Sequence, residues 1–284
     1  MHDLWRIREV KGVLGRQMEN GAWKYPAGGR RWIRSSEDYN QLETYRMLGV
    51  LVEKYGLNSE SPAVARAAEF LLSHQTSEGD LRGIYGSQYS PNYTAAIIEL
   101  LIKAGYEGDP RIDKAFRWLL SIRQNDGGWA IPLRTLRLNW AAKTMSSRTF
   151  QGDKSQPFSH LVTGVVLRAF AAHSMYRKSQ EGKNAGRLLA SRFFLRDVYP
   201  DRQGPDFWTK FSYPFWFTDL LSSLDSLSLL GFKAEGPQIR KGLQWFATRQ
   251  QRNGGWQLPL LRTRDKDLKL WINLAICRVF RRFY

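Results

Sequence analysis

One short motif recurs along the chain, and this repetition limits the possible folds more than any other feature. Each copy has a glutamine, a turn that contains glycine, a tryptophan, and a proline three residues after the tryptophan. Three full copies occupy residues 17–26, 124–132 and 250–259, and two degenerate copies lie at 75–91 and 192–214. One such unit is too small to bury its own apolar face, so the pattern predicts a protein of stacked repeats.

A second signal lies out of phase with the first and marks the boundaries of helices. Gly56, Gly105 and Gly231 are each followed by a proline five or six residues later. A glycine after one helix and a proline at the first position of the next are typical of such boundaries. Between them apolar residues recur at helical spacing, as Ile239 and Leu243 do. The repeating unit is therefore two helices joined by the loop that carries the motif.

Five such hairpins are predicted. The first helices are expected at residues 3–16, 62–75, 110–123, 183–196 and 237–250. The second helices, which are more apolar, are expected at residues 37–55, 92–104, 158–173, 214–230 and 266–282. A threonine or asparagine recurs early in each second helix, at Thr44, Thr94, Thr163, Thr218 and Asn273.

Stacked hairpins can remain open as a solenoid or close into a ring of inner and outer helices. The more apolar second helices suit an inner ring. The expected fold class is therefore all-α, an α/α toroid that forms one domain over residues 1–284. A basic loop insertion is expected at about residues 133–156.

Composition excludes several classes of protein. Apolar residues make up 43% of the chain and aromatic residues 13%, which excludes bulk disorder. Cys277 is the only cysteine, so there is no internal disulfide framework. No apolar run reaches the roughly 20 residues of a membrane span, and the first residues lack the apolar region of a secretory signal. We therefore expect a cytoplasmic protein, with peripheral attachment to a membrane as an alternative.

The net charge of +17 is unevenly distributed. Residues 1–130 carry 17 Lys and Arg against 16 Asp and Glu, whereas residues 131–284 carry 26 against 10. Such a region attracts nucleic acid or an anionic membrane surface, although solubility alone would also explain the charge. The candidate anion-binding residues are Arg134, Arg137, Lys143, Arg148, Lys154, Arg192 and Arg196. For the last two, an internal ion-pair network is the alternative.

The repeat resembles that of squalene–hopene cyclases and other class II terpene cyclases, and that of the catalytic subunits of protein prenyltransferases. In that superfamily Gln-x-x-x-Gly-x-Trp motifs lie in loops of an α/α toroid and have a structural role. Residues 17–23 and 250–256 fit this spacing, and residues 124–129 are one residue short. The resemblance implies the toroid fold and an isoprenoid-like substrate.

The motifs that carry the chemistry of these families are absent. Class II cyclases protonate their substrate with the middle acid of Asp-x-Asp-Asp-Thr-Ala, and the matching residues 90–95 read Ser-Pro-Asn-Tyr-Thr-Ala. Protein prenyltransferases hold zinc with Asp, Cys and His, and Cys277 has no histidine near it in the sequence. We therefore expect neither acid-initiated cyclisation of the usual kind nor zinc. No cofactor is predicted, and Mg²⁺ bound with a diphosphate substrate is the alternative.

Three residues are candidates for catalysis. Asp219 follows an aromatic run at the start of a second helix, where an acid could face an apolar cavity; the alternative is an acid that stabilises the helix dipole. Glu43 precedes the recurring Thr44, and its alternative is a salt bridge. His160 begins another second helix, and its alternative is a capping or packed histidine.

Asn92, Tyr93, Trp216 and Trp271 lie near the starts of second helices and are candidates to line a ligand cavity. Aromatic rings there could stack on isoprenoid carbons, or could simply fill the ring of helices. The leading hypothesis is a toroid that binds an isoprenoid-like or other apolar small molecule, including a non-standard cyclase or transferase. A non-enzymatic polyanion-binding protein is the second hypothesis, and an acidic-polysaccharide lyase-like enzyme is the third.

Overall fold

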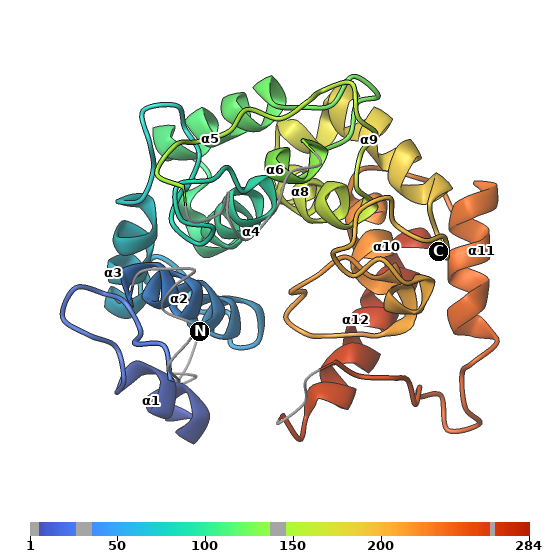
Figure 1. Cartoon of the computed structure of the whole chain (residues 1–284). Coiled ribbons are helices and arrows are strands. Elements are labelled where there is room, and N and C mark those ends of the chain that lie inside the picture. Colours follow the sequence, from blue (N-terminus) through green and yellow to red (C-terminus); the bar gives the residue numbers. More distant parts are fainter. Residues whose placement is uncertain (1–5, 27–35, 137–145, 262–264) are drawn as a thin grey trace. The chain divides into compact units, whose positions relative to one another are not determined.

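The chain consists of two compact helical units (Figure 1). The computed structural model describes residues 6–26, 36–136, 146–261 and 265–284. Unit 1 contains residues 1–123 and 131–156, and unit 2 contains residues 124–130 and 157–284. The short segment 124–130 therefore packs with the later half of the chain, although it directly follows a helix of unit 1.

Unit 1 contains the first two predicted hairpins and the first helix of the third. Its helices are α1 (Arg8–Leu14), α2 (Ser36–Glu53), α3 (Pro62–Leu72), α4 (Pro91–Leu101), the π-helical turn η2 (Ile102–Tyr106), α5 (Pro110–Ser121) and the short α6 (Pro132–Thr135). A proline stands at the start of α3, α4 and α5, where its missing N–H costs nothing. The two second helices α2 and α4 pack against each other, and α3 and α5 pack on them.

Unit 2 contains the remaining second helices and their partners. Its helices are α8 (His160–Ala172), η3 (Tyr176–Lys178), α9 (Gln180–Ser191), η4 (Pro205–Thr209), α10 (Leu220–Leu229), α11 (Pro237–Ala247) and α12 (Leu268–Phe283). Here α10 packs against both α8 and α12, so the second helices lie side by side. The described residues form isolated β-bridges but no named strand. The prediction of an all-α fold of repeated hairpins is confirmed.

The predicted helix starts need two corrections in unit 2. Helix α10 begins at Leu220 instead of residue 214, because Asp219 is an extended residue that caps the helix. Helix α9 begins at Gln180 instead of residue 183, because the Ser179 side chain caps it by accepting from Gly182 N. A single domain over residues 1–284 remains a prediction.

The recurring threonine or asparagine connects each second helix to the loop that carries the motif. In four repeats its side-chain oxygen accepts a hydrogen bond from a loop backbone N–H. These bonds are Trp23 N to Thr44 Oγ1 (2.9 Å), Leu81 N to Thr94 Oγ1 (3.0 Å), Trp129 N to Thr163 Oγ1 (2.9 Å) and Trp256 N to Asn273 Oδ1 (2.6 Å). In the degenerate fourth repeat, Thr218 instead donates to Leu161 O at 2.6 Å. The threonine or asparagine that recurs in the sequence thus marks a hydrogen bond between the loop and the second helix.

The glutamine of the motif joins one repeat to the next. Gln17 Nε2 donates to Gly21 O in its own loop at 2.9 Å and to Ala63 O in the first turn of α3 at 2.8 Å. Gln75 repeats this arrangement with Gly79 O and with Arg111 O of α5. The structural role that the resemblance implies for these residues is consistent with these contacts.

Backbone bonds also explain the irregular copies of the motif. Gln124 N donates to Gly128 O, as Gln251 N donates to Gly255 O, so Gln124 occupies the position after the motif glutamine. This register accounts for the spacing that is one residue short. In the second repeat Leu81, and not Tyr85, holds the position of the tryptophan, because Leu81 N bonds Thr94.

Candidate functional site

The start of α4 carries residues 90–95, the segment compared above with the acid motif of the cyclases, and its Tyr93 contacts two further tyrosines. Tyr93 of α4 lies edge to face with Tyr85 of the preceding loop, with ring centroids 5.2 Å apart, and with Tyr45 of α2 at 6.1 Å. We call Tyr45, Tyr85 and Tyr93 the tyrosine cluster. The bond between Leu81 N and Thr94 holds the loop against α4 and so positions Tyr85.

Two polar atoms at this helix start are buried and have no hydrogen-bond partner among the described residues. They are Ser90 Oγ and Asn92 Oδ1. Asn92 Nδ2 reaches the Tyr85 hydroxyl at 3.4 Å, which is a long hydrogen bond. Because an unpaired buried polar atom costs free energy, such atoms are candidates to bind a ligand or water. The carboxamide oxygen can accept a hydrogen bond, but an amide cannot deliver a proton as a carboxylic acid does.

Glu43 lies on α2 and is buried. Its Oε2 is 3.6 Å from Arg46 Nη1. Burial raises the pKa of Glu43, and Arg46 opposes that rise. The neighbouring Thr44 hydroxyl is used by the loop of the first repeat. The geometry thus places Glu43 in an ion pair at the interior of unit 1.

Asp219 belongs to unit 2, where it is the N-cap of α10. Its carboxylate accepts from Ser222 N at 2.8 Å, and Asp219 N donates to Ser222 Oγ at 2.9 Å, which completes a capping box. Burial raises the pKa of Asp219 to about 7, against the opposing effects of Ser222 and Arg168. This carboxyl can therefore hold a proton near neutral pH while it caps the helix.

His160 is the first residue of α8 and lies in a buried polar group with Asp197. Its Nδ1 is 3.4 Å from Asp197 Oδ2, and its ring packs on Trp208 with centroids 4.6 Å apart. The same Asp197 oxygen accepts from Ser159 Oγ and from Leu161 N. Burial lowers the pKa of His160 to about 4, although Asp197 opposes this effect. His160 is thus neutral at physiological pH, and Asp197 stabilises the start of α8.

Trp216 and Trp271 both lie in unit 2 and are half-buried. Trp271 of α12 stacks on Tyr213 with centroids 5.7 Å apart and an interplanar angle of 8°. Tyr213 in turn contacts Phe215 edge to face. Trp216 N donates to Ser212 Oγ at 3.3 Å. Of the four residues predicted to line a ligand cavity, Asn92 and Tyr93 belong to unit 1, and the two tryptophans belong to unit 2.

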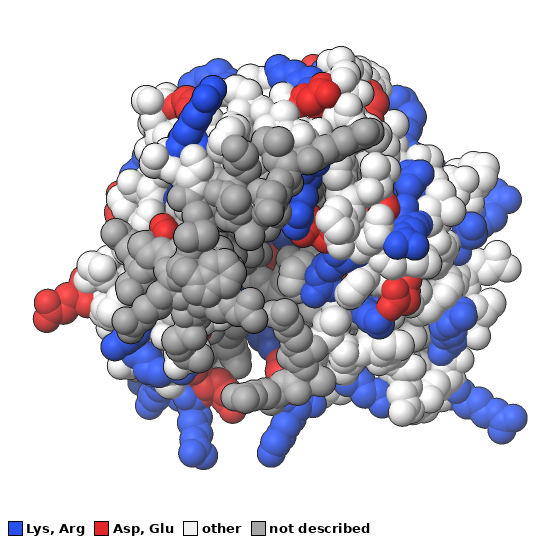
Figure 2. Space-filling model, in the orientation of Figure 1, with Lys and Arg blue, Asp and Glu red and all other residues white. Residues whose placement is uncertain are grey.

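Three of the candidate anion-binding residues donate hydrogen bonds to nearby oxygen atoms of the protein itself. Lys154 Nζ donates to Ser121 O, Arg192 to Arg196 O, and Arg196 to Gln203 Oε1, each at 2.6 Å. Arg148 lies over the ring of Phe150 and Arg134 is in the last turn of α6. Arg137 and Lys143 lie outside the described residues. On the face shown in Figure 2, Lys and Arg are dispersed among neutral side chains.

None of the helices in the described parts of the chain is both long and apolar enough to cross a membrane. Those parts also bring no three His, Cys, Asp or Glu side chains together in a metal-binding arrangement.

The site at the start of α4 lies inside a region that matches a known family. Residues 38–149 match the squalene–hopene cyclase C-terminal domain. This region is terpene cyclase-like. The terpene cyclase-like region includes α2 to α6, and so contains the tyrosine cluster and Asn92.

Curated relatives agree with this match. A probable squalene–hopene cyclase of Sinorhizobium fredii is 33% identical over 159 residues, which cover 43% of this chain and 24% of that protein. A squalene–hopene cyclase of Zymomonas mobilis is 24% identical over 139 residues, which cover 44% of this chain and 20% of that protein. The matched part is thus about a quarter or less of each relative's length. The resemblance seen in the repeats is confirmed.

The solved structure of a protein from Actinoplanes can be superposed on 98% of this chain. The match covers 86% of the Actinoplanes chain, at 15% sequence identity. Its TM-score is 0.42, which is too low to bear on fold or function.

Sequence reasoning identified Asn92 and Tyr93 but missed Tyr45, Tyr85 and Ser90. Tyr45 directly follows the recurring Thr44, and that repeat position was the one signal that could have placed it beside the loop. Tyr85 had no such signal, because its position depends on how the loop returns to α4.

Proposed function

We propose that the protein binds an isoprenoid-like apolar molecule at the tyrosine cluster and Asn92. The observation that carries this proposal is the buried Asn92 Oδ1, which has no hydrogen-bond partner among the described residues and belongs to a side chain that reaches Tyr85 of the tyrosine cluster. It stands at the position where the terpene cyclase family has its proton-donating acid. The ring faces offer an apolar surface for isoprenoid carbons, and the carboxamide oxygen offers an acceptor for a ligand hydroxyl.

The proposal assigns no acid-initiated cyclisation to this site. Protonation of an alkene needs a carboxylic acid held in a dry cavity, and Asn92 has no such proton to transfer. A ligand that carries a hydroxyl would donate a hydrogen bond to Asn92 Oδ1 and so satisfy this buried acceptor. We therefore propose that an isoprenoid alcohol binds better than the hydrocarbon of the same length.

A binding measurement with farnesol tests this proposal. We expect Tyr93→Ala to weaken the binding of farnesol by about five- to 150-fold, since removal of one aromatic contact with the ligand costs about 1 to 3 kcal/mol. Asn92→Ala should reduce the preference for farnesol over farnesene, because it removes the acceptor for the hydroxyl. Isothermal titration calorimetry with both probes measures these changes.

Tyr106→Ala is the matched control, because Tyr106 lies in η2 at the opposite end of the same helical segment. It should leave the affinity for farnesol unchanged. Equal affinity of the wild type and the folded Tyr93→Ala variant would refute the proposal, as would the absence of farnesol binding by the wild type.

A further inference from the structure

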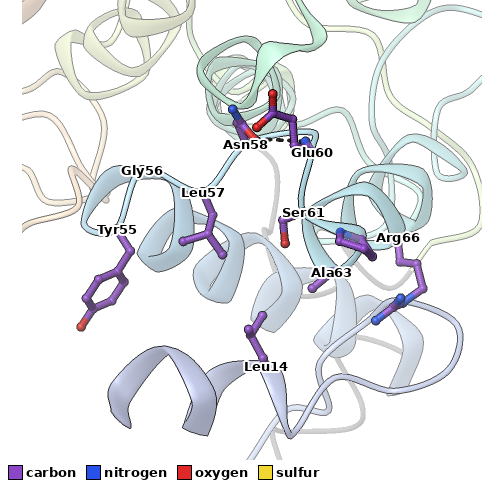
Figure 3. Close-up of a pocket in the computed structure, with 10 residues that line it drawn as sticks. Leu14, Tyr55, Gly56, Leu57, Asn58, Glu60, Ser61, Ala63 and Arg66 are labelled. Atoms are coloured by element: carbon purple, nitrogen blue, oxygen red, sulfur yellow. Dashed lines mark hydrogen bonds between the residues drawn. The ribbon is translucent and has the colours of Figure 1, made fainter. Parts of the chain in front are cut away.

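A cavity of about 480 Å³ lies elsewhere in unit 1, among the end of α1, the turn after α2 and the start of α3 (Figure 3). Its size falls in the range of small-molecule sites in proteins, about 300 to 1,000 Å³. None of its lining residues belongs to the tyrosine cluster. The residues that matter for its chemistry are Leu14, Leu57, Ser61, Ala63 and Arg66.

The local sequence explains why the cavity forms. Helix α2 ends at Glu53, and Gly56 in the turn that follows adopts φ of 63°, a conformation that favours glycine. The chain then turns through residues 57–61 before Pro62 begins α3. This turn holds Leu57 and Ser61 above Leu14 of α1, and the side chains of all three point into the space between them (Figure 3). The turn therefore forms one wall of the cavity, and α1 forms the other.

One part of the lining is apolar and another is polar. Leu14 and Leu57 supply the apolar part, with Ala63 beside them. Ser61 is the N-cap residue of α3, but its hydroxyl makes no capping hydrogen bond. That hydroxyl is therefore free to bond a ligand in the cavity.

Arg66 supplies a cation at the edge of the cavity. Its Nη2 donates to Gln17 Oε1 at 2.8 Å. No carboxylate of the described residues lies within ion-pair distance of it, and four of its five N–H groups remain for other partners. Glu60 also lies at this turn, but Figure 3 shows its side chain directed away from Leu14 and Leu57. The charge that faces a ligand at this edge is therefore positive.

We propose that this cavity binds a small amphipathic carboxylate. The apolar chain of the ligand lies against Leu14, Leu57 and Ala63, and its carboxylate accepts hydrogen bonds from Arg66 and Ser61. Arginine suits this role because its fork of N–H groups matches the two oxygens of a carboxylate. The first turn of α3 carries no acidic residue that would compete for this position.

Calorimetric titration with decanoate and with decanol tests the proposal. The wild type should bind decanoate more tightly than decanol. Arg66→Gln should weaken the binding of decanoate about three- to tenfold and leave that of decanol nearly unchanged, because the arginine is exposed and solvent screens its ion pair. Leu14→Trp should abolish the binding of both probes by filling the cavity. Leu57→Trp is the second filling variant if Leu14→Trp does not fold.

Two controls make the result specific. Arg117→Gln removes an exposed arginine of α5 that pairs with Asp113, and it should leave decanoate binding unchanged. Tyr93→Ala should also leave it unchanged, because the tyrosine cluster is a separate site. The proposal is overturned if Arg66→Gln binds decanoate as the wild type does, or if binding survives both folded filling variants. Loss of decanoate binding in Tyr93→Ala would likewise overturn it and assign the probe to the tyrosine cluster.

Discussion

Replacing Trp129 with alanine should lower the free energy of unfolding of unit 2 by about 3 to 5 kcal/mol, the usual cost of removing a large buried ring. Trp129 is completely buried and packs on Phe170 of α8, with ring centroids 5.4 Å apart. Its backbone N–H also donates to Thr163, so the side chain lies where the loop is attached to the helix. The resulting cavity would therefore loosen the attachment of residues 124–130 to unit 2. Urea denaturation followed by circular dichroism measures the change.

Trp129→Phe and Trp245→Ala are the controls for this prediction. Trp129→Phe keeps a ring against Phe170 and should recover most of the lost stability. Trp245 of α11 is only half-buried, so its replacement should cost clearly less. Equal losses for Trp129→Ala and Trp245→Ala would contradict the buried anchoring role of Trp129.

Raising the pH from about 4 to about 7 should destabilise unit 2 through Asp219. The ordinary pKa of this carboxyl is 3.8, and burial raises its pKa in the folded protein to about 7. The folded state therefore keeps a proton that the unfolded state loses between these values. The stabilising contribution is complete below the unfolded pKa and is lost as the pH rises through the folded pKa. Three pKa units correspond to about 4 kcal/mol at 1.36 kcal/mol each.

Asp219→Asn removes this titration while it keeps a side-chain oxygen that can cap α10. The variant should lose the part of the change in stability between pH 4 and pH 7 that comes from Asp219. Denaturant titrations at pH 4.5, 6 and 8 measure the difference. An unchanged pH dependence in the folded variant would show that Asp219 ionises normally.

His160 should make the stability of unit 2 depend on pH in the opposite direction, so that its contribution grows as the pH rises. Its pKa is lowered from 6.5 to about 4, so the unfolded state binds a proton more readily than the folded state. Its stabilising contribution is complete above the unfolded pKa and is lost as the pH falls from about 6.5 to about 4. His160→Phe, which keeps a ring against Trp208, should reduce this loss at acid pH. Denaturant titrations of that variant at pH 4.5 and 7 measure the effect, and an unchanged loss would contradict it.

Part of the candidate site could be predicted from the sequence. Asn92 and Tyr93 were found because they occupy a motif with a fixed order along the chain. Tyr45 and Tyr85 were not found, because they come from α2 and from a loop, and only packing brings them to α4. The cavity at Arg66 had no sequence signal at all, since Leu14 and Leu57 come from α1 and from the turn after α2.

Local sequence patterns were enough to predict the repeat, the all-α class and the approximate ranges of the helices of the five hairpins. These features depend on local physics, namely helical spacing of apolar residues, proline at helix starts and glycine after helix ends. Packing between distant segments, in contrast, sets the bond of Trp129 to Thr163 and the start of α10 at the Asp219 cap. It also leaves Asn92 Oδ1 without a partner in the part of the chain that the structure describes. Each of these depends on which distant segments meet, and a buried polar group is satisfied or left unpaired only by the neighbours that packing supplies.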